Sequence, residues 1–197
     1  PGGAGHDSAY IGFGKGGFYF DRPGSYRVRA AYAALDGSEV LSDILDIRVR
    51  YPVTEAEEDM ADLFMGEDQG TLLYLLGSDS QYLRKGNDAF AEVIQKYPKT
   101  DMANYARLVL GTNAGRTFKT ISDIDPNRVV ERTADPAESS KLLSTVVNSG
   151  VLDPVSTQQT LQNLASVQTK AGDAEGAKKS LDALSVKTGR KTKAANK

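Results

Sequence analysis

Residues 89–98 have the sequence AFAEVIQKYP, and this stretch decides the class of the fold. Its large apolar side chains recur at spacings of i, i+3, i+4 and i+7, which places them along one face of a helix. They are Phe90, Val93, Ile94 and Tyr97. Pro98 ends this helix, since proline cannot continue the backbone hydrogen bonding. A new helix is predicted over residues 101–111, so the middle of the chain is helical.

Towards the C-terminus, two Asp-Pro pairs predict further helix starts. Asp135-Pro136 and Asp153-Pro154 each place a capping side chain directly before a proline at the first helical position. The last two helices are expected at residues 156–171 and 177–184, with a turn at Gly172-Asp173 between them. The sequence therefore predicts a mainly helical C-terminal half.

Towards the N-terminus, the helical pattern begins at Thr54. Thr54 and Glu57 form a capping box, in which two side chains satisfy the first free amides of a helix. Gly66 and Gly70 are expected to interrupt this acidic helix, and residues 72–76 to form a short buried one. Within the helical half, residues 127–133 are instead expected to form a polar loop with a leaning towards strand.

Residues 9–51 have the pattern of β-structure. Residues 26–33 and 45–51 alternate apolar with more polar side chains, as expected for strands with one wet face. Asp36-Gly37-Ser38 lies between them and is typical of a hairpin turn. Pro52 ends this part because it lacks an amide hydrogen.

The run Asp21-Arg22-Pro23-Gly24-Ser25-Tyr26 resembles the corner that enters strand F of immunoglobulin-like sandwiches. The resemblance implies that the Tyr26 hydroxyl bonds to the upstream backbone and that an F–G hairpin follows. A full sandwich needs about seven strands over about 100 residues. The missing strands would come from before Pro1 or from another chain; alternatively, the small sheet packs on the helices.

Residues 89–111 and 161–184 resemble tetratricopeptide hairpins, in which small residues let two helices approach and large ones fill the seam. Residues 117–153 do not follow the repeat of about 34 residues. The repeat is therefore degenerate, and a plain helical bundle is the alternative.

The repeat resemblance implies a partner-binding face on the first helix of each hairpin, at residues 101–111 and 156–171. Polar residues outside the apolar stripe would form this face. They are Asn104, Arg107, Gln158, Gln162 and Gln168. An immunoglobulin-like corner followed by helices also resembles the C-terminal part of large uncharacterised bacterial proteins, which favours a bacterial extracytoplasmic location.

Composition and motifs exclude several classes of function. The net charge of -2 argues against a nucleic-acid surface, and no apolar run is long enough to span a membrane. The chain has no cysteine and a single histidine, His6, so a thiolate or histidine metal cluster is excluded. Gly12 to Gly17 matches G-x-G-x-x-G, but strand-like residues follow, which indicates a glycine-rich turn rather than a phosphate loop. No cofactor and no catalytic activity are expected.

These observations predict an α+β fold, with a short antiparallel β-part followed by an α-helical, tetratricopeptide-like region. The expected divisions are a flexible leader (1–8), a partial immunoglobulin-like part (9–52), a helical region (53–188) and a basic disordered tail (189–197). The expected function is a non-catalytic interaction or scaffolding segment of a larger protein, whose partner is a protein, a peptide or another part of the parent protein.

Two alternatives remain open. The chain could be an accessory region of a secreted enzyme whose catalytic domain lies upstream. It could also be a glycan- or surface-binding module that uses Tyr10, Phe18 and Tyr19 as a platform.

Overall fold

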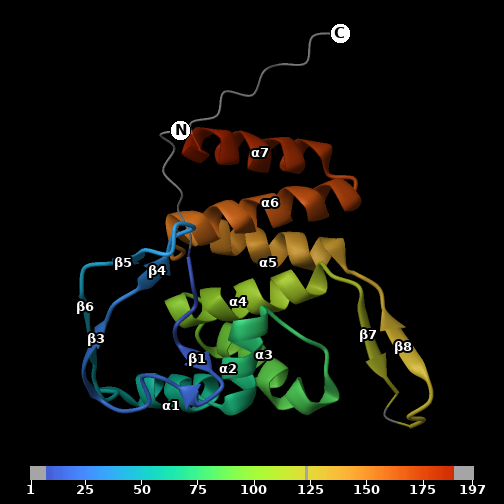
Figure 1. Ribbon diagram of the computed structural model, residues 1–197. Helices are drawn as coiled ribbons and strands as arrows, with labels where there is room; N and C mark the ends of the chain where they lie inside the picture. Colours follow the sequence, from blue (N-terminus) through green and yellow to red (C-terminus); the bar gives the residue numbers. More distant parts are fainter. Residues whose placement is uncertain (1–7, 123, 189–197) are drawn as a thin grey trace.

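The computed structural model describes residues 8–122 and 124–188, and it has a mixed α+β fold (Figure 1). The helices in this part are α1 (Glu55–Phe64), α2 (Glu67–Leu75), the 3-10 turn η1 (Gln81–Leu83), α3 (Arg84–Lys96), α4 (Asp101–Ala114), α5 (Pro136–Ser149), α6 (Pro154–Lys170) and α7 (Ala174–Thr188). The strands are β1 (Phe13–Gly14), β2 (Gly17–Phe18), β3 (Gly24–Val28), β4 (Ala31–Ala33), β5 (Glu39–Leu41), β6 (Leu45–Val49), β7 (Phe118–Ile121) and β8 (Val129–Arg132). The α+β class predicted from the sequence is confirmed. The expected leader, apart from Ser8, and the expected basic tail lie outside the described residues.

The helices from α3 to α7 pack on their neighbours in chain order, and Figure 1 shows them as a stack with α7 at one end. The two predicted Asp-Pro starts are confirmed. Asp135 accepts a hydrogen bond from the amide of Glu138 at 3.0 Å, and Asp153 accepts one from the amide of Val155 at 2.9 Å. None of the helices in the described part is long and apolar enough to cross a membrane.

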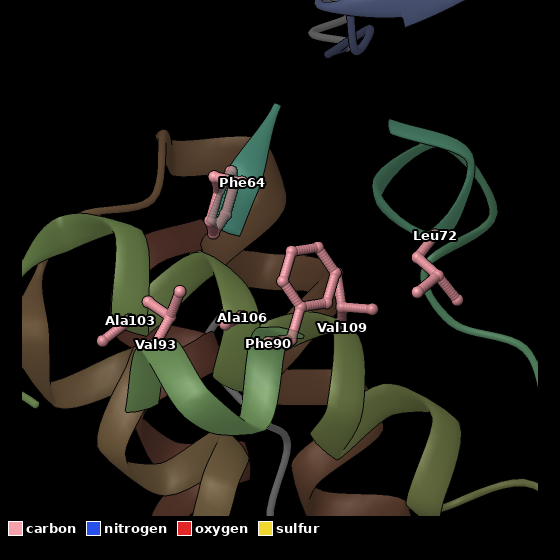
Figure 2. Close-up of a cluster of buried hydrophobic side chains, with 7 residues drawn as sticks. All are labelled: Phe64, Leu72, Phe90, Val93, Ala103, Ala106 and Val109. Carbon is pink, nitrogen blue, oxygen red and sulfur yellow. The ribbon is translucent and has the colours of Figure 1, made fainter. Parts of the chain in front are cut away.

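The main core lies where α1 and α2 pack on α3 and where α4 covers α3 from the other side. Its centre is Phe90, which is fully buried and whose ring lies 5.0 Å from that of Phe64. Ala103 and Ala106 face the same cluster, and their small side chains let α4 approach α3 closely. Figure 2 shows the buried side chains of this cluster, Phe64, Leu72, Phe90, Val93, Ala103, Ala106 and Val109.

Gly70 does not break a helix, which corrects the expectation from the sequence. It lies inside α2, whereas Gly66 does stand at the helix start, as the N-cap. The hairpin β1–β2 packs on α2, and a Cβ atom at Gly70 would overlap the ring of Phe13. The glycine is therefore explained by close packing against an aromatic ring.

The predicted hairpin between residues 24 and 49 is confirmed. Strand β3 pairs antiparallel with β6, with Tyr26 opposite Ile47, and β4 pairs with β5, with Tyr32 opposite Val40. The turn closes where the amide of Ala34 donates to the carbonyl of Ser38 at 2.8 Å. We call residues 24–49 the ribbon; in Figure 1 it lies along one side of the helical stack.

Strands β7 and β8 pair as a second hairpin, where the sequence predicted a polar, strand-leaning loop over 127–133. Lys119 and Glu131 lie opposite each other and form an ion pair at 3.2 Å. Arg132 pairs with Asp79, which also accepts a hydrogen bond of 2.5 Å from the side-chain amide of Asn113 in α4. These contacts fix the base of the hairpin on the helices, on the side of the stack away from the ribbon in Figure 1.

Candidate interaction site

The five polar residues expected to line a binding face are not all at the surface. Asn104, Arg107 and Gln168 are buried, with 8%, 8% and 7% of their surface exposed, so their assignment outside the core is wrong. Gln158 is half-buried, and Gln162 is exposed. Only these two are open to a partner without repacking of the helices.

Each of the three buried residues has a partner inside the protein. The Arg107 guanidinium donates to the Asn104 side-chain oxygen and to the carbonyl of Pro98, both at 2.8 Å. This joins α4 to the end of α3. Gln168 accepts a hydrogen bond of 2.8 Å from the Ser180 hydroxyl and so joins α6 to α7. These side chains satisfy buried polar groups between helices.

A cavity of about 170 Å³ lies where α4, α5 and α6 meet. Arg116 and Lys170 contribute to its lining, and no acidic residue does. At its base the fully buried Ser139 donates a hydrogen bond of 2.7 Å to the carbonyl of Gly111. The charge of this cavity suits a small anion better than a cation.

The ribbon has one apolar face and one charged face. Val28 lies opposite Leu45, and Tyr26 lies opposite Ile47, all on one face. Leu45 is 57% exposed, whereas Tyr26, Val28, Ile47 and Val49 are half-buried, and no helix packs closely on β3 or β6 in the described part of the chain. The other face carries charged side chains and a serine, namely Ser25, Arg27, Asp46 and Arg48. An apolar sheet face on which no helix packs closely is a candidate interaction surface.

The hydrogen bond predicted from the Tyr26 hydroxyl to the upstream backbone is present at the start of the ribbon. The Tyr26 hydroxyl donates to the carbonyl of Arg22 at 2.6 Å, and the amide of Arg22 donates to the same hydroxyl at 3.2 Å. Phe20 packs edge-on against the Tyr26 ring at 5.1 Å between centroids. The ring is half-buried rather than fully buried.

Replacing Tyr26 by Phe should destabilise the ribbon by about 1 kcal/mol, because both hydrogen bonds are lost while the ring packing stays. Hydrogen exchange of the β3 and β6 amides measures this locally, whereas global unfolding reports mainly on the helices. Tyr32→Phe is the matched control, since Tyr32 is 66% exposed. Equal protection in both variants would contradict a structural role for the corner.

A bidentate ion pair joins the end of the ribbon to the first turn of α1. The Arg50 guanidinium donates to both carboxylate oxygens of Glu57, at 2.7 and 2.8 Å, and the amide of Val53 also donates to Glu57. Chiefly the hydrogen bonds from Arg50 lower the pKa of Glu57 from 4.5 to about 2. The predicted capping box is present: Thr54 accepts from the amide of Glu57, and the Thr54 backbone also helps to lower the pKa of Glu57, although Arg50 and Val53 contribute more.

This joint should be sensitive to acid. The pKa of Glu57 is lowered in the folded protein, so its ionised carboxylate stabilises the fold. This stabilisation is complete above about pH 4.5, shrinks as the pH falls, and is lost below about pH 2. The carboxyl ¹³C shift of Glu57 should therefore titrate near 2, and Arg50→Gln should move the midpoint up towards 4.5. Arg48→Gln, which alters an arginine on the same strand, should leave it unchanged. The same midpoint in the parent protein and both variants would refute the ion pair between Arg50 and Glu57.

Among residues 8–122 and 124–188, no three His, Cys, Asp or Glu side chains come together to hold a metal ion. No protein-family model, curated protein or solved structure matches this chain. The apolar face of the ribbon, on which no helix packs closely, is the candidate interaction site of the described residues. The alternation of residues 45–51 indicates this apolar face, but nothing in the sequence shows that the helices leave it open.

Proposed function

We propose that this chain is a non-catalytic protein-interaction segment whose helical stack supports the ribbon for completion by further β-strands. The observation that carries the proposal is the uncovered apolar face between β3 and β6. A two-stranded hairpin is at best marginally stable alone, and three or more strands or a packed layer are needed for independent stability. The ribbon is thus suited to a partner that supplies such a layer.

The chemistry of the ribbon favours β-strands as the occupant. In the described part of the chain, β3 pairs only with β6, which leaves the outer edge of β3 with free main-chain donors and acceptors. A strand satisfies these groups, and a second sheet packs on the apolar face at a spacing of about 10 Å. A helix could cover the face but would leave the edge unpaired. The Tyr26 corner supports strands of an immunoglobulin-like sandwich, from the parent polypeptide or another chain.

The helices serve as the support in this proposal. Helices α3 to α7 pack on one another in chain order, and the ion pair between Arg50 and Glu57 fixes the end of the ribbon on α1. The ribbon is therefore held in a defined position where Tyr51-Pro52 connects it to the helices. Ordering it in advance lowers the entropic cost of binding.

Site-specific photo-crosslinking in the source cells tests the proposal. A photoreactive residue at Tyr32 or Leu45 probes the ribbon, and one at Gln158 or Gln162 probes the helical face expected from the sequence. We expect the ribbon positions to crosslink to a β-strand segment, identified by mass spectrometry. Crosslinks from the helical positions alone would move the site to the stack and overturn the proposal.

A further inference from the structure

The second free edge of the ribbon belongs to β6, whose sequence LDIRV spans residues 45–49. Leu45, Ile47 and Val49 lie on the apolar face, and Asp46 and Arg48 lie on the charged face. One edge of β6 pairs with β3, and its other edge has no partner strand in the described part of the chain.

The residues of β6 are self-complementary about Ile47. If two copies pair antiparallel across a two-fold axis at Ile47, each Leu45 lies opposite Val49 of the second copy. Each Asp46 then lies opposite Arg48 of the second copy. Apolar side chains meet on one face and opposite charges meet on the other, which are both favourable cross-strand pairs.

Neighbouring registers lack this complementarity. A shift that centres the axis on Arg48 places two arginines opposite each other, and Asp46 then faces Arg50, which is already paired with Glu57. A shift that centres the axis on Asp46 places two aspartates opposite each other. A slip by one residue sets charged side chains against apolar ones, because successive residues point to opposite faces. Self-pairing of β3 would set Ser25 against Arg27 and bring no opposite charges together.

Within one copy, Arg48 remains available for an ion pair with a second copy. Arg27 already pairs with Asp46 at 3.5 Å, whereas Arg48 lies opposite Ser25 and has no acidic partner in the described part of the chain. Pairing about Ile47 would extend each Arg27–Asp46 pair to Arg48 of the second copy. Edge strands that are protected from pairing often carry charges that repel a second strand. Here the two charges have opposite sign and attract.

We propose that the free edge of β6 binds a second copy of this chain, forming a four-stranded sheet in the order β3-β6-β6-β3. This interface is separate from the proposed function, since it leaves the outer edges of both β3 strands and the shared apolar face open to a partner. It makes the molecule bivalent for that partner.

Disulfide trapping in the full chain tests the register, and the chain contains no cysteine that could interfere. Directly opposed residues have Cβ atoms about 4.5 to 5.5 Å apart, within reach of a disulfide after small adjustments. Ile47→Cys should therefore form a covalent dimer under mild oxidation. Val28→Cys, on the same face but in β3, is the matched control and should remain monomeric. Equal crosslinking of the two variants, or none at Ile47→Cys, would overturn the proposal.

Charge exchange in the Ile47→Cys background tests the pairing chemistry. Asp46→Arg makes both edge charges positive and Arg48→Asp makes both negative, so each variant alone should crosslink about tenfold more slowly. An equal mixture of the two should recover fast crosslinking, and only as the mixed dimer. This recovery also shows that neither variant has lost its ribbon. Slow crosslinking in the mixture, with ribbon amide shifts retained in both variants, would refute the paired charges.

Asp43→Arg and Arg29→Asp are matched controls, because they make the same charge changes at exposed positions outside β6. Both should crosslink like the parent Ile47→Cys protein. If they slow crosslinking as much as the β6 variants do, net charge rather than register governs association, and the proposal fails. Neither outcome alters the photo-crosslink expected from Tyr32 to a different partner, whereas a crosslink from Leu45 to Val49 of a second copy would report the present interface.

Discussion

Replacing Phe90 by Ala should lower the free energy of unfolding by about 3 to 5 kcal/mol. Phe90 is fully buried at the junction of α1, α2, α3 and α4, and its ring packs against Phe64 (Figure 2). The substitution removes one of the two phenylalanine side chains of the core cluster and leaves a cavity, because the four surrounding helices can relax into it only in part. Denaturant unfolding followed by far-ultraviolet circular dichroism measures this change.

Tyr82→Ala is the control for the Phe90 prediction. Tyr82 is also aromatic, but 81% of its surface is exposed, so its removal should change stability by less than about 0.5 kcal/mol. A loss below about 1 kcal/mol for Phe90→Ala would be small for a filled core. It would show that α1 and α2 do not pack on α3 as described.

Gly77→Ala should destabilise the protein by about 3 kcal/mol, because two penalties add. The backbone of Gly77 has φ of +100°, a conformation that residues with a side chain rarely adopt. A Cβ atom there would also lie 2.5 Å from Cβ of Asn113 and 2.9 Å from the carbonyl oxygen of Val109. Thermal unfolding of the full chain measures the combined loss.

Gly172→Ala separates the two penalties. Gly172 also has a positive φ, +80°, but no atom lies within 4 Å of the Cβ position. Its substitution should cost only the backbone term, about 1 to 2 kcal/mol. If both alanine variants lose the same stability, the close approach of residue 77 to α4 is not real.

Local signals in the sequence predicted the elements well. The caps at Thr54, Asp135 and Asp153 and the turn at residues 36–38 depend on neighbours within a few positions, so the sequence contains the complete information. The hairpin β7–β8 was missed as a pair. Its strands have only four residues each, and a short alternating run is hard to distinguish from a loop.

Contacts between distant segments were not predictable in this way. Gly70 was expected to end a helix, because nothing near it in the sequence shows that Phe13 packs on it. Arg107 was assigned to the binding face as a polar residue outside the apolar stripe, yet it satisfies the free carbonyl of Pro98 inside the fold. The Gly70 error arises because its packing depends on a segment distant in the sequence, and the Arg107 error because the free carbonyl after α3 is visible only once α3 and α4 are placed together.

The β7–β8 hairpin makes the connection between α4 and α5 tolerant of insertions. The amide of Asp135 donates to the carbonyl of Ala114 at 2.8 Å, so the two ends of the connection already meet. Residues between them form a closed loop, and lengthening a closed loop costs little further entropy, about 0.6 kcal/mol per doubling. At Ile124, which is 95% exposed, a reporter peptide could therefore be inserted without changing the spacing of α4 and α5.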